Sequence, residues 1–115
     1  MNRFDMKVGE WTIDVRRAGW DEDIKRAYEQ LNLLPGTKYK PIAKIATQIV
    51  AGLNYITVAE QTIEGSPMPN QVCILFWSHA DRDRTISICS IVPIKNGEPV
   101  TIPDGRVVEW DKYNS

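Results

Sequence analysis

After residue 37 the chain alternates four strand-like runs with short clusters of turn residues, and no other feature constrains the fold as strongly. The runs cover residues 39–49, 53–63, 71–78 and 85–94. The connecting segment 64–70 is rich in glycine, proline and small polar residues, whereas residues 80–84 are mostly charged. Turns this short join neighbouring antiparallel strands, so the pattern predicts a β-meander.

The N-terminal third of the chain predicts one strand followed by one helix. Residues 9–16 alternate apolar and polar side chains from Trp11 onward, which is the period of a half-buried strand. Asp21 can then cap a helix, which residues 34–36, Leu-Pro-Gly, bring to an end. The apolar face of this helix recurs at three- and four-residue intervals and comprises Ile24, Ala27, Tyr28 and Leu31.

These elements predict an α+β fold in which a four- to five-stranded antiparallel sheet wraps across one long helix. With 115 residues and 43% hydrophobic content, the chain is expected to be a single domain spanning residues 1–115. Residues 95–115 form a C-terminal extension with turn signals at Asn96-Gly97 and Asp104-Gly105. This extension is either a short added strand pair or a tail lying along the sheet.

Pairing between the last two runs can be predicted from their side chains. If Ile74 faces Ile88, then Phe76 faces Ile86 on the helix-covered side, and Cys73 faces Cys89 on the other. Opposed cysteines could form a cross-strand disulfide. An intracellular chain instead favours two reduced, partly buried thiols.

Composition argues against several classes of function. The formal net charge is −1 with scattered basic residues, which does not fit nucleic-acid binding. No apolar run approaches the length of a membrane span, and residues 1–8 do not contain the apolar core of an export signal. A cytoplasmic location is therefore expected, or a secreted or periplasmic one if a signal peptide has been removed.

Residues 48–55 read Gln-Ile-Val-Ala-Gly-Leu-Asn-Tyr and place a short apolar turn between two predicted strands. Gln-x-Val-x-Gly followed by x-Asn-Tyr resembles the first hairpin loop of the cystatins, the small protein inhibitors of papain-like cysteine proteases. The order of strand, helix and hairpins is also similar to the cystatin arrangement over roughly residues 9–94. Among cystatins, the absence of a signal and of spaced cysteine pairs brings the chain nearer to the cytosolic stefins, while plant cystatins are the other comparison.

The resemblance implies a reversible, non-covalent inhibitor that is not an enzyme and needs no cofactor. In cystatins an N-terminal segment and two hairpin loops form a wedge that enters the protease cleft. Carried onto this sequence, the N-terminal element is Gly9, preceded by Lys7 and Val8. The expected protease-binding residues are Gly9, Gln48, Ile49, Val50, Ala51, Gly52, Trp77 and His79.

The predicted second loop departs most from the family. It reads Trp-Ser-His-Ala over residues 77–80, without the proline that cystatins carry there. Trp77 is expected on the outer face of the sheet close to this loop, and His79 lies near the position of a stefin histidine. The departure favours an alternative function, a cystatin-like protein-interaction module without inhibitory activity. The chain is expected to be a monomer or a hairpin-swapped dimer.

Other interpretations of the same residues are less specific. The glycine of the 48–52 turn could simply relieve backbone strain in an ordinary hairpin. A small enzyme or ligand carrier would need a polar pocket or a base–nucleophile pair, and the single histidine has no clear partner. His79, Asp81 and Asp83 could ligate a metal, but interleaved arginines favour a solvated charged turn, so no metal site is expected.

Overall fold

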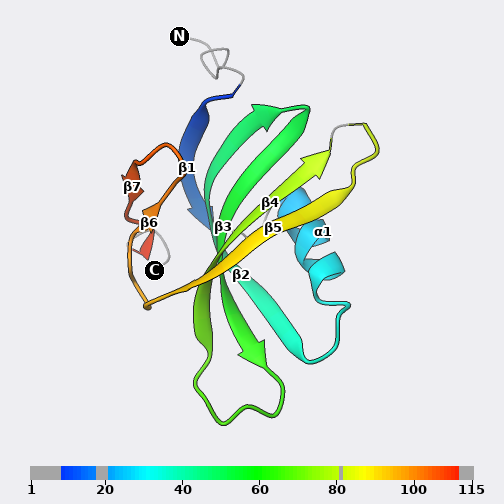
Figure 1. The fold of residues 1–115 in the computed structure, drawn as a ribbon, viewed down its shortest axis with the longest axis vertical. Helices are drawn as coiled ribbons and strands as arrows, with labels where there is room; N and C mark the ends of the chain where they lie inside the picture. Colours follow the sequence, from blue (N-terminus) through cyan, green and yellow to red (C-terminus); the bar gives the residue numbers. More distant parts are fainter. Residues whose placement is uncertain (1–8, 18–20, 81, 112–115) are drawn as a thin grey trace.

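The computed structural model describes residues 9–17, 21–80 and 82–111 and contains one α-helix and a five-stranded antiparallel sheet (Figure 1). The sheet follows chain order, β1-β2-β3-β4-β5, so every strand pairs with its neighbours in sequence and the predicted meander is confirmed. The elements are β1 (Trp11–Arg17), α1 (Glu22–Leu31), β2 (Thr37–Val50), β3 (Gly52–Ile63), β4 (Gln71–Ala80), β5 (Ile86–Ile94), β6 (Val100–Thr101) and β7 (Val107–Val108).

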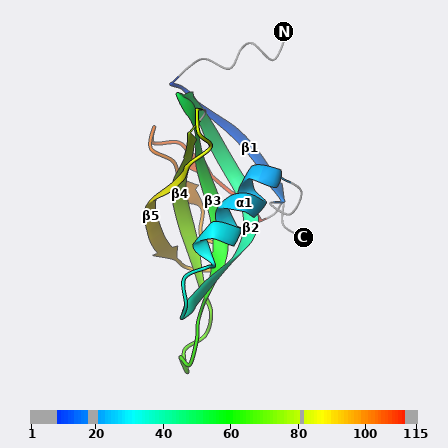
Figure 2. The same ribbon diagram turned by 90° about the vertical axis from the view of Figure 1, so that its right-hand side faces the viewer.

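Helix α1 begins and packs as its sequence predicts. The Asp21 carboxylate accepts a hydrogen bond from the Ile24 amide at 3.1 Å, which satisfies one of the free donors of the first turn. Ile24, Ala27 and Tyr28 are buried against one face of the sheet (Figure 2). The helix has ten residues, and no helix in the described part of the chain is long and apolar enough to cross a membrane.

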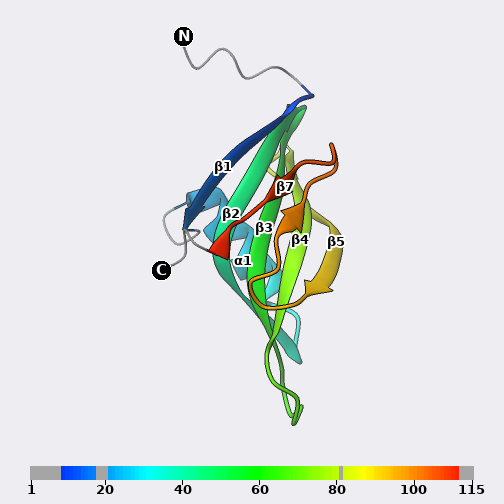
Figure 3. The same cartoon turned by 90° about the vertical axis from the view of Figure 1, so that its left-hand side faces the viewer.

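The C-terminal segment covers the opposite face of the sheet. Strands β6 and β7 pair with each other and lie on the side away from α1 (Figure 3). Four buried side chains of the C-terminal segment join a core with Trp11, Ala43, Ile45, Ala46, Ile56, Val58 and Ile94, and these four are Val100, Ile102, Val108 and Trp110. Of the two alternatives for this segment, the structure shows the short strand pair, and the sheet becomes the middle of three layers.

The pairing predicted between β4 and β5 is wrong. Ile74 lies opposite Val92 rather than Ile88, and Phe76 lies opposite Ser90 rather than Ile86. The helix-covered face carries Cys73, Leu75 and Trp77, whereas Val72, Ile74 and Phe76 pack toward the C-terminal segment. Both faces of β4 are covered by apolar layers, so the alternation of its side chains did not indicate which face the helix covers.

The two cysteines are not opposed in the sheet. Cys73 pairs with Pro93, while Cys89 lies at the bulge between the Phe76 and Trp77 pairings. Both thiols are free; Cys73 is buried and Cys89 is exposed. Two free thiols agree with the expectation, but only Cys73 is buried.

Candidate functional site

The β2–β3 hairpin ends in a turn narrower than the one predicted. Val50 pairs with Gly52, so Ala51 alone occupies the apex, while Gln48 and Ile49 are already paired residues of β2. Gly52 has a φ of +123°, a backbone conformation that residues with a Cβ rarely adopt. The tip therefore consists of exposed Val50 and Ala51 and half-buried Gly52, with Val50 41% exposed.

Gln48 joins the hairpin to the start of the chain. Its Nε2 donates to the Gly9 carbonyl at 2.7 Å, and its Oε1 accepts from Asn54 Nδ2 at 2.8 Å. The Gly9 amide in turn donates to the Ile49 carbonyl at 2.9 Å. The Gln and Asn of the motif thus lie opposite each other across the hairpin and fix Gly9 beside its tip.

The β4–β5 turn lies next to the same hairpin tip. Gly52 pairs with Ala80, and the Ala80 amide donates to the Thr85 carbonyl at 2.8 Å. Within the turn, Asp83 Oδ1 accepts from the Thr85 amide at 3.0 Å, and hydrogen bonds from Thr85 lower the Asp83 pKa. Figure 1 shows the start of β1, the hairpin and this turn at one end of the sheet. We call Gly9, the 48–52 hairpin and the 82–85 turn the hairpin edge.

Trp77 does not belong to the hairpin edge, and its predicted position on the outer face is wrong. It is 0% exposed and lies beneath α1 with the other helix-facing residues of β4. Its ring stacks on Tyr55 at a centroid distance of 4.1 Å, and its Nε1 donates to Thr57 Oγ1 at 3.0 Å. A side chain held in this way cannot reach a partner.

His79 also points under the helix instead of out of the turn. It lies in β4, two residues after Trp77 and on the same face, with its side chain 11% exposed. The prediction that His79 contacts a protease from the second loop therefore does not fit its position. Lys7, Val8 and Asp81, which the sequence analysis also considered, lie outside the described residues.

A polar cluster around His79 escaped the sequence analysis. Tyr55 Oη donates to Asp23 Oδ2 at 3.1 Å, and the other carboxylate oxygen of Asp23 faces three nitrogen-bearing side chains. These lie 3.8 Å (Arg26), 3.9 Å (His79) and 3.9 Å (Arg84) from Oδ1. Burial, followed by the Asp21 and Asp23 charges, raises the pKa of Tyr55. We call Asp23, Arg26, Tyr55, His79 and Arg84 the Asp23 cluster.

The sequence did not single out Asp23 or Arg26 as candidate site residues. The sequence did not indicate which face of β4 lies beneath α1, and the position of His79 depends on this. Once Trp77 is placed beneath α1, the alternation of a strand puts His79 on the same face.

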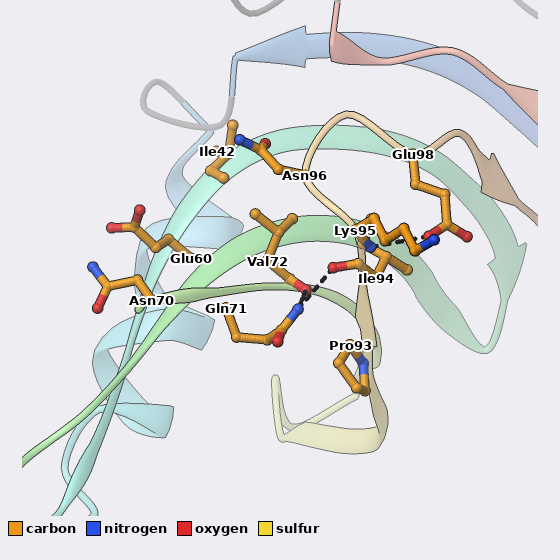
Figure 4. A pocket seen from close by; sticks show the side chains of 10 residues that line it. All are labelled: Ile42, Glu60, Asn70, Gln71, Val72, Pro93, Ile94, Lys95, Asn96 and Glu98. Atoms are coloured by element: carbon orange, nitrogen blue, oxygen red, sulfur yellow. Dashed lines mark hydrogen bonds between the residues drawn. The ribbon is translucent and has the colours of Figure 1, made fainter. Parts of the chain in front are cut away.

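An open groove of about 820 Å³ is shown in Figure 4, and none of its lining residues belongs to the hairpin edge. Gln71 Nε2 donates to the Ile94 carbonyl at 2.7 Å across its floor. The charged groups of the groove are two carboxylates and one ammonium group, and its lining provides no base–nucleophile pair. The lining residues are Ile42, Glu60, Asn70, Gln71, Val72, Pro93, Ile94, Lys95, Asn96 and Glu98. In the described part of the chain, no group of three or more His, Cys, Asp or Glu residues could hold a metal ion.

Comparison with known proteins gave no match to a family model, to a curated protein or to a solved structure.

Proposed function

We propose that this protein is a cystatin-like, reversible and non-covalent inhibitor of papain-like cysteine proteases, which inserts the 48–52 hairpin into the active-site cleft. The observation that carries the proposal is the bonding of Gln48, which ties Gly9 to the hairpin. The order of one helix and five strands in the sheet is compatible with a cystatin-like fold and supports the proposal.

The hairpin tip has the properties that occlusion of a narrow cleft requires. Val50, Ala51 and Gly52 are uncharged, and burying them costs no desolvation of ionised groups. The strands behind the tip are paired from Val50 and Gly52 down to Thr37 and Ile63, so little backbone freedom is left to lose on binding. The hairpin offers no catalytic group, and the proposed inhibition consists of shape fit alone.

The 82–85 turn is expected to contribute little to the strength of inhibition. It presents exposed Arg82, Asp83 and Arg84 and lacks the proline of the second cystatin loop, and Trp77 is buried. Most of the affinity is then expected from Gly9 and the 48–52 hairpin. The same observation favours the second candidate function, a protein-interaction module that uses this edge without inhibiting a protease.

Titration of papain with the purified protein tests the proposal. Wild type should inhibit hydrolysis of a small substrate at micromolar concentration or below, and inhibition should reverse on dilution. Val50→Asp places a charge in the apolar tip, and Gly52→Arg cannot easily keep the positive φ, so both should weaken inhibition. Met68→Asp, at a 72% exposed site in the 64–70 turn, is the matched control.

Three results of this titration separate the candidates. Inhibition by wild type and Met68→Asp but not by the two hairpin variants supports the proposal. Equal inhibition by all four proteins contradicts the assignment of the hairpin. No inhibition by wild type contradicts the inhibitory function and leaves the interaction module.

A further inference from the structure

We infer that Asp23 is a positioning residue for the 82–85 turn and that protonation of His79 releases this turn from the helix. The inference deepens the proposed function, because the turn belongs to the hairpin edge through which the protein is proposed to bind. Its first test, however, concerns the free protein and does not depend on protease binding.

The geometry shows one acceptor shared by several groups. Asp23 Oδ1 lies 3.8 Å from Arg26 Nη1, 3.9 Å from His79 Nε2 and 3.9 Å from Arg84 Nη2. Its partner oxygen is occupied by the Tyr55 hydroxyl at 3.1 Å. The carboxylate side chain is 28% exposed, whereas that of Arg84 is 64% exposed. Arg84 is thus the outermost group and the contact that joins the turn to α1.

The contact between His79 and Arg26 depends on the protonation state of the ring. Arg26 Nη1 lies 3.4 Å from His79 Nε2, and a guanidinium group can only donate. The contact is therefore a hydrogen bond when Nε2 accepts, as it does in a neutral imidazole with its proton on Nδ1. The cross-strand neighbours of His79 are the uncharged Leu53 and Ile86. Among the described residues, the charged and titratable groups around the ring are thus Asp23, Arg26, Tyr55 and Arg84.

Protonation changes this arrangement in a defined direction. A charged imidazole donates from both nitrogens, so it loses the contact with Arg26 and gains a stronger interaction with Asp23 Oδ1. Three positive groups would then share one carboxylate. Arg84 is the most exposed of them and has the most solvent-screened contact with Asp23, so it is the group displaced.

Arg84 also lies at a constrained point of the backbone. Its φ of +60° is the one positive value among non-glycine residues in the described ranges. Such a conformation is unfavourable for arginine and persists where surrounding contacts hold it. Loss of the Asp23 contact should therefore loosen residues 82–85 rather than the side chain alone.

An NMR titration of the free protein tests this inference. The chain contains a single histidine, so its imidazole signals report His79 without ambiguity. In a titration between about pH 5 and about pH 8, the amide signals of Arg84 and Thr85 should move with the same midpoint as the imidazole. Asp83 does not interfere, because its pKa is held below the usual carboxyl range.

Three variants make this result specific. In His79→Gln the turn signals should stay fixed across the same range. In Asp23→Asn the imidazole should titrate while the turn no longer follows it. Glu22→Gln is the matched control, because Glu22 is 81% exposed, contacts Lys25 and should leave the coupling unchanged. Turn signals that stay fixed in wild type, or that still follow the imidazole in Asp23→Asn, would overturn the inference.

Inhibition of papain provides the second test. Acidification should weaken wild type relative to His79→Gln by about two- to fivefold, the size of a partly exposed ion-pair effect. Taking the ratio of the two proteins at each pH removes the pH dependence of the protease itself. If this ratio stays constant with pH while the turn signals follow the imidazole signals in the NMR titration, the turn has no role in binding. If wild type does not inhibit at any pH, the proposed function fails, while the NMR result still decides whether Asp23 holds the turn.

Discussion

Gln48 shows how a single side chain can connect two segments that are distant in sequence. Its amide group bonds Gly9 through Nε2 and Asn54 through Oε1, so both of its polar atoms are used. A shorter or apolar residue at position 48 could not bridge the hairpin to the start of β1. The Gln48–Asn54 bond holds the two strands of this hairpin together, independently of what the hairpin edge binds.

Replacing Gln48 tests this connection. Gln48→Ala removes two side-chain hydrogen bonds and should lower the free energy of unfolding by about 1–2 kcal/mol. It should also speed hydrogen exchange at the Gly9 amide. Gln61→Ala, which removes a comparable bond to the Tyr39 hydroxyl, is the control and should leave Gly9 exchange unchanged. Gly9 exchange that is equal in wild type and Gln48→Ala would contradict the role given to Gln48.

At the scale of elements, the C-terminal segment is a structural layer rather than a loose extension. Trp110 is 1% exposed and donates from Nε1 to the Glu98 carbonyl at 2.8 Å, which closes the segment on itself. Arg106 Nη2 donates to the Trp11 carbonyl at 2.6 Å and so ties this layer to β1. The strand that begins beside Gly9 is therefore held from both sides, by β2 and by the C-terminal layer.

The stability of this layer can be measured through Trp110. Trp110→Ala should lower the free energy of unfolding in urea by about 3–5 kcal/mol, the usual cost of removing a large buried aromatic. Val107→Ala is the control, since Val107 is 63% exposed and its change should stay within about 0.5 kcal/mol. Similar small effects of both variants would show that the layer contributes little to the core.

Local sequence patterns predicted the helix and the strands well, because a helix cap, an apolar helix face or a strand depends on residues that are close together in the sequence. The Asp21 cap, the apolar face of α1 and the four strands of the meander were all indicated by such patterns. The register of β4 with β5 was not, because the bulge at Cys89 and the apolar cover on both sheet faces depend on distant residues. The Asp23 cluster was missed for the same reason, since it joins α1, β3, β4 and the 82–85 turn.

For the whole molecule, the sheet separates two hydrophobic cores, and no buried side chain of the described residues belongs to both. The core beneath α1 includes a buried hydroxyl, Thr57, which meets Tyr28 Oη at 2.6 Å and accepts from Trp77 Nε1 at 3.0 Å. Burial raises the pKa of Tyr28, and burial with nearby carboxylates raises that of Tyr55. Both phenols are thus held neutral in the folded protein.

The raised tyrosine pKa values predict how stability changes in alkali. An unfolded tyrosine loses its proton near pH of about 10, while Tyr28 and Tyr55 keep theirs in the folded state. Their contribution to stability is therefore fully present below about pH 10 and is lost as the pH rises further. Urea unfolding at a series of pH values should show this decline, and Tyr28→Phe should reduce its slope. Equal slopes in wild type and Tyr28→Phe would contradict the assignment.

We propose that the hairpin edge occludes a papain-like cleft without any covalent step. An NMR titration of the isotope-labelled protein with papain whose catalytic thiol has been blocked by a small group tests this directly. We expect a complex at micromolar concentration, with signal changes at Gly9, at residues 50–52 and at residues 82–85, and none in the 64–70 turn. Absence of a complex, or changes centred on the 64–70 turn, would contradict it.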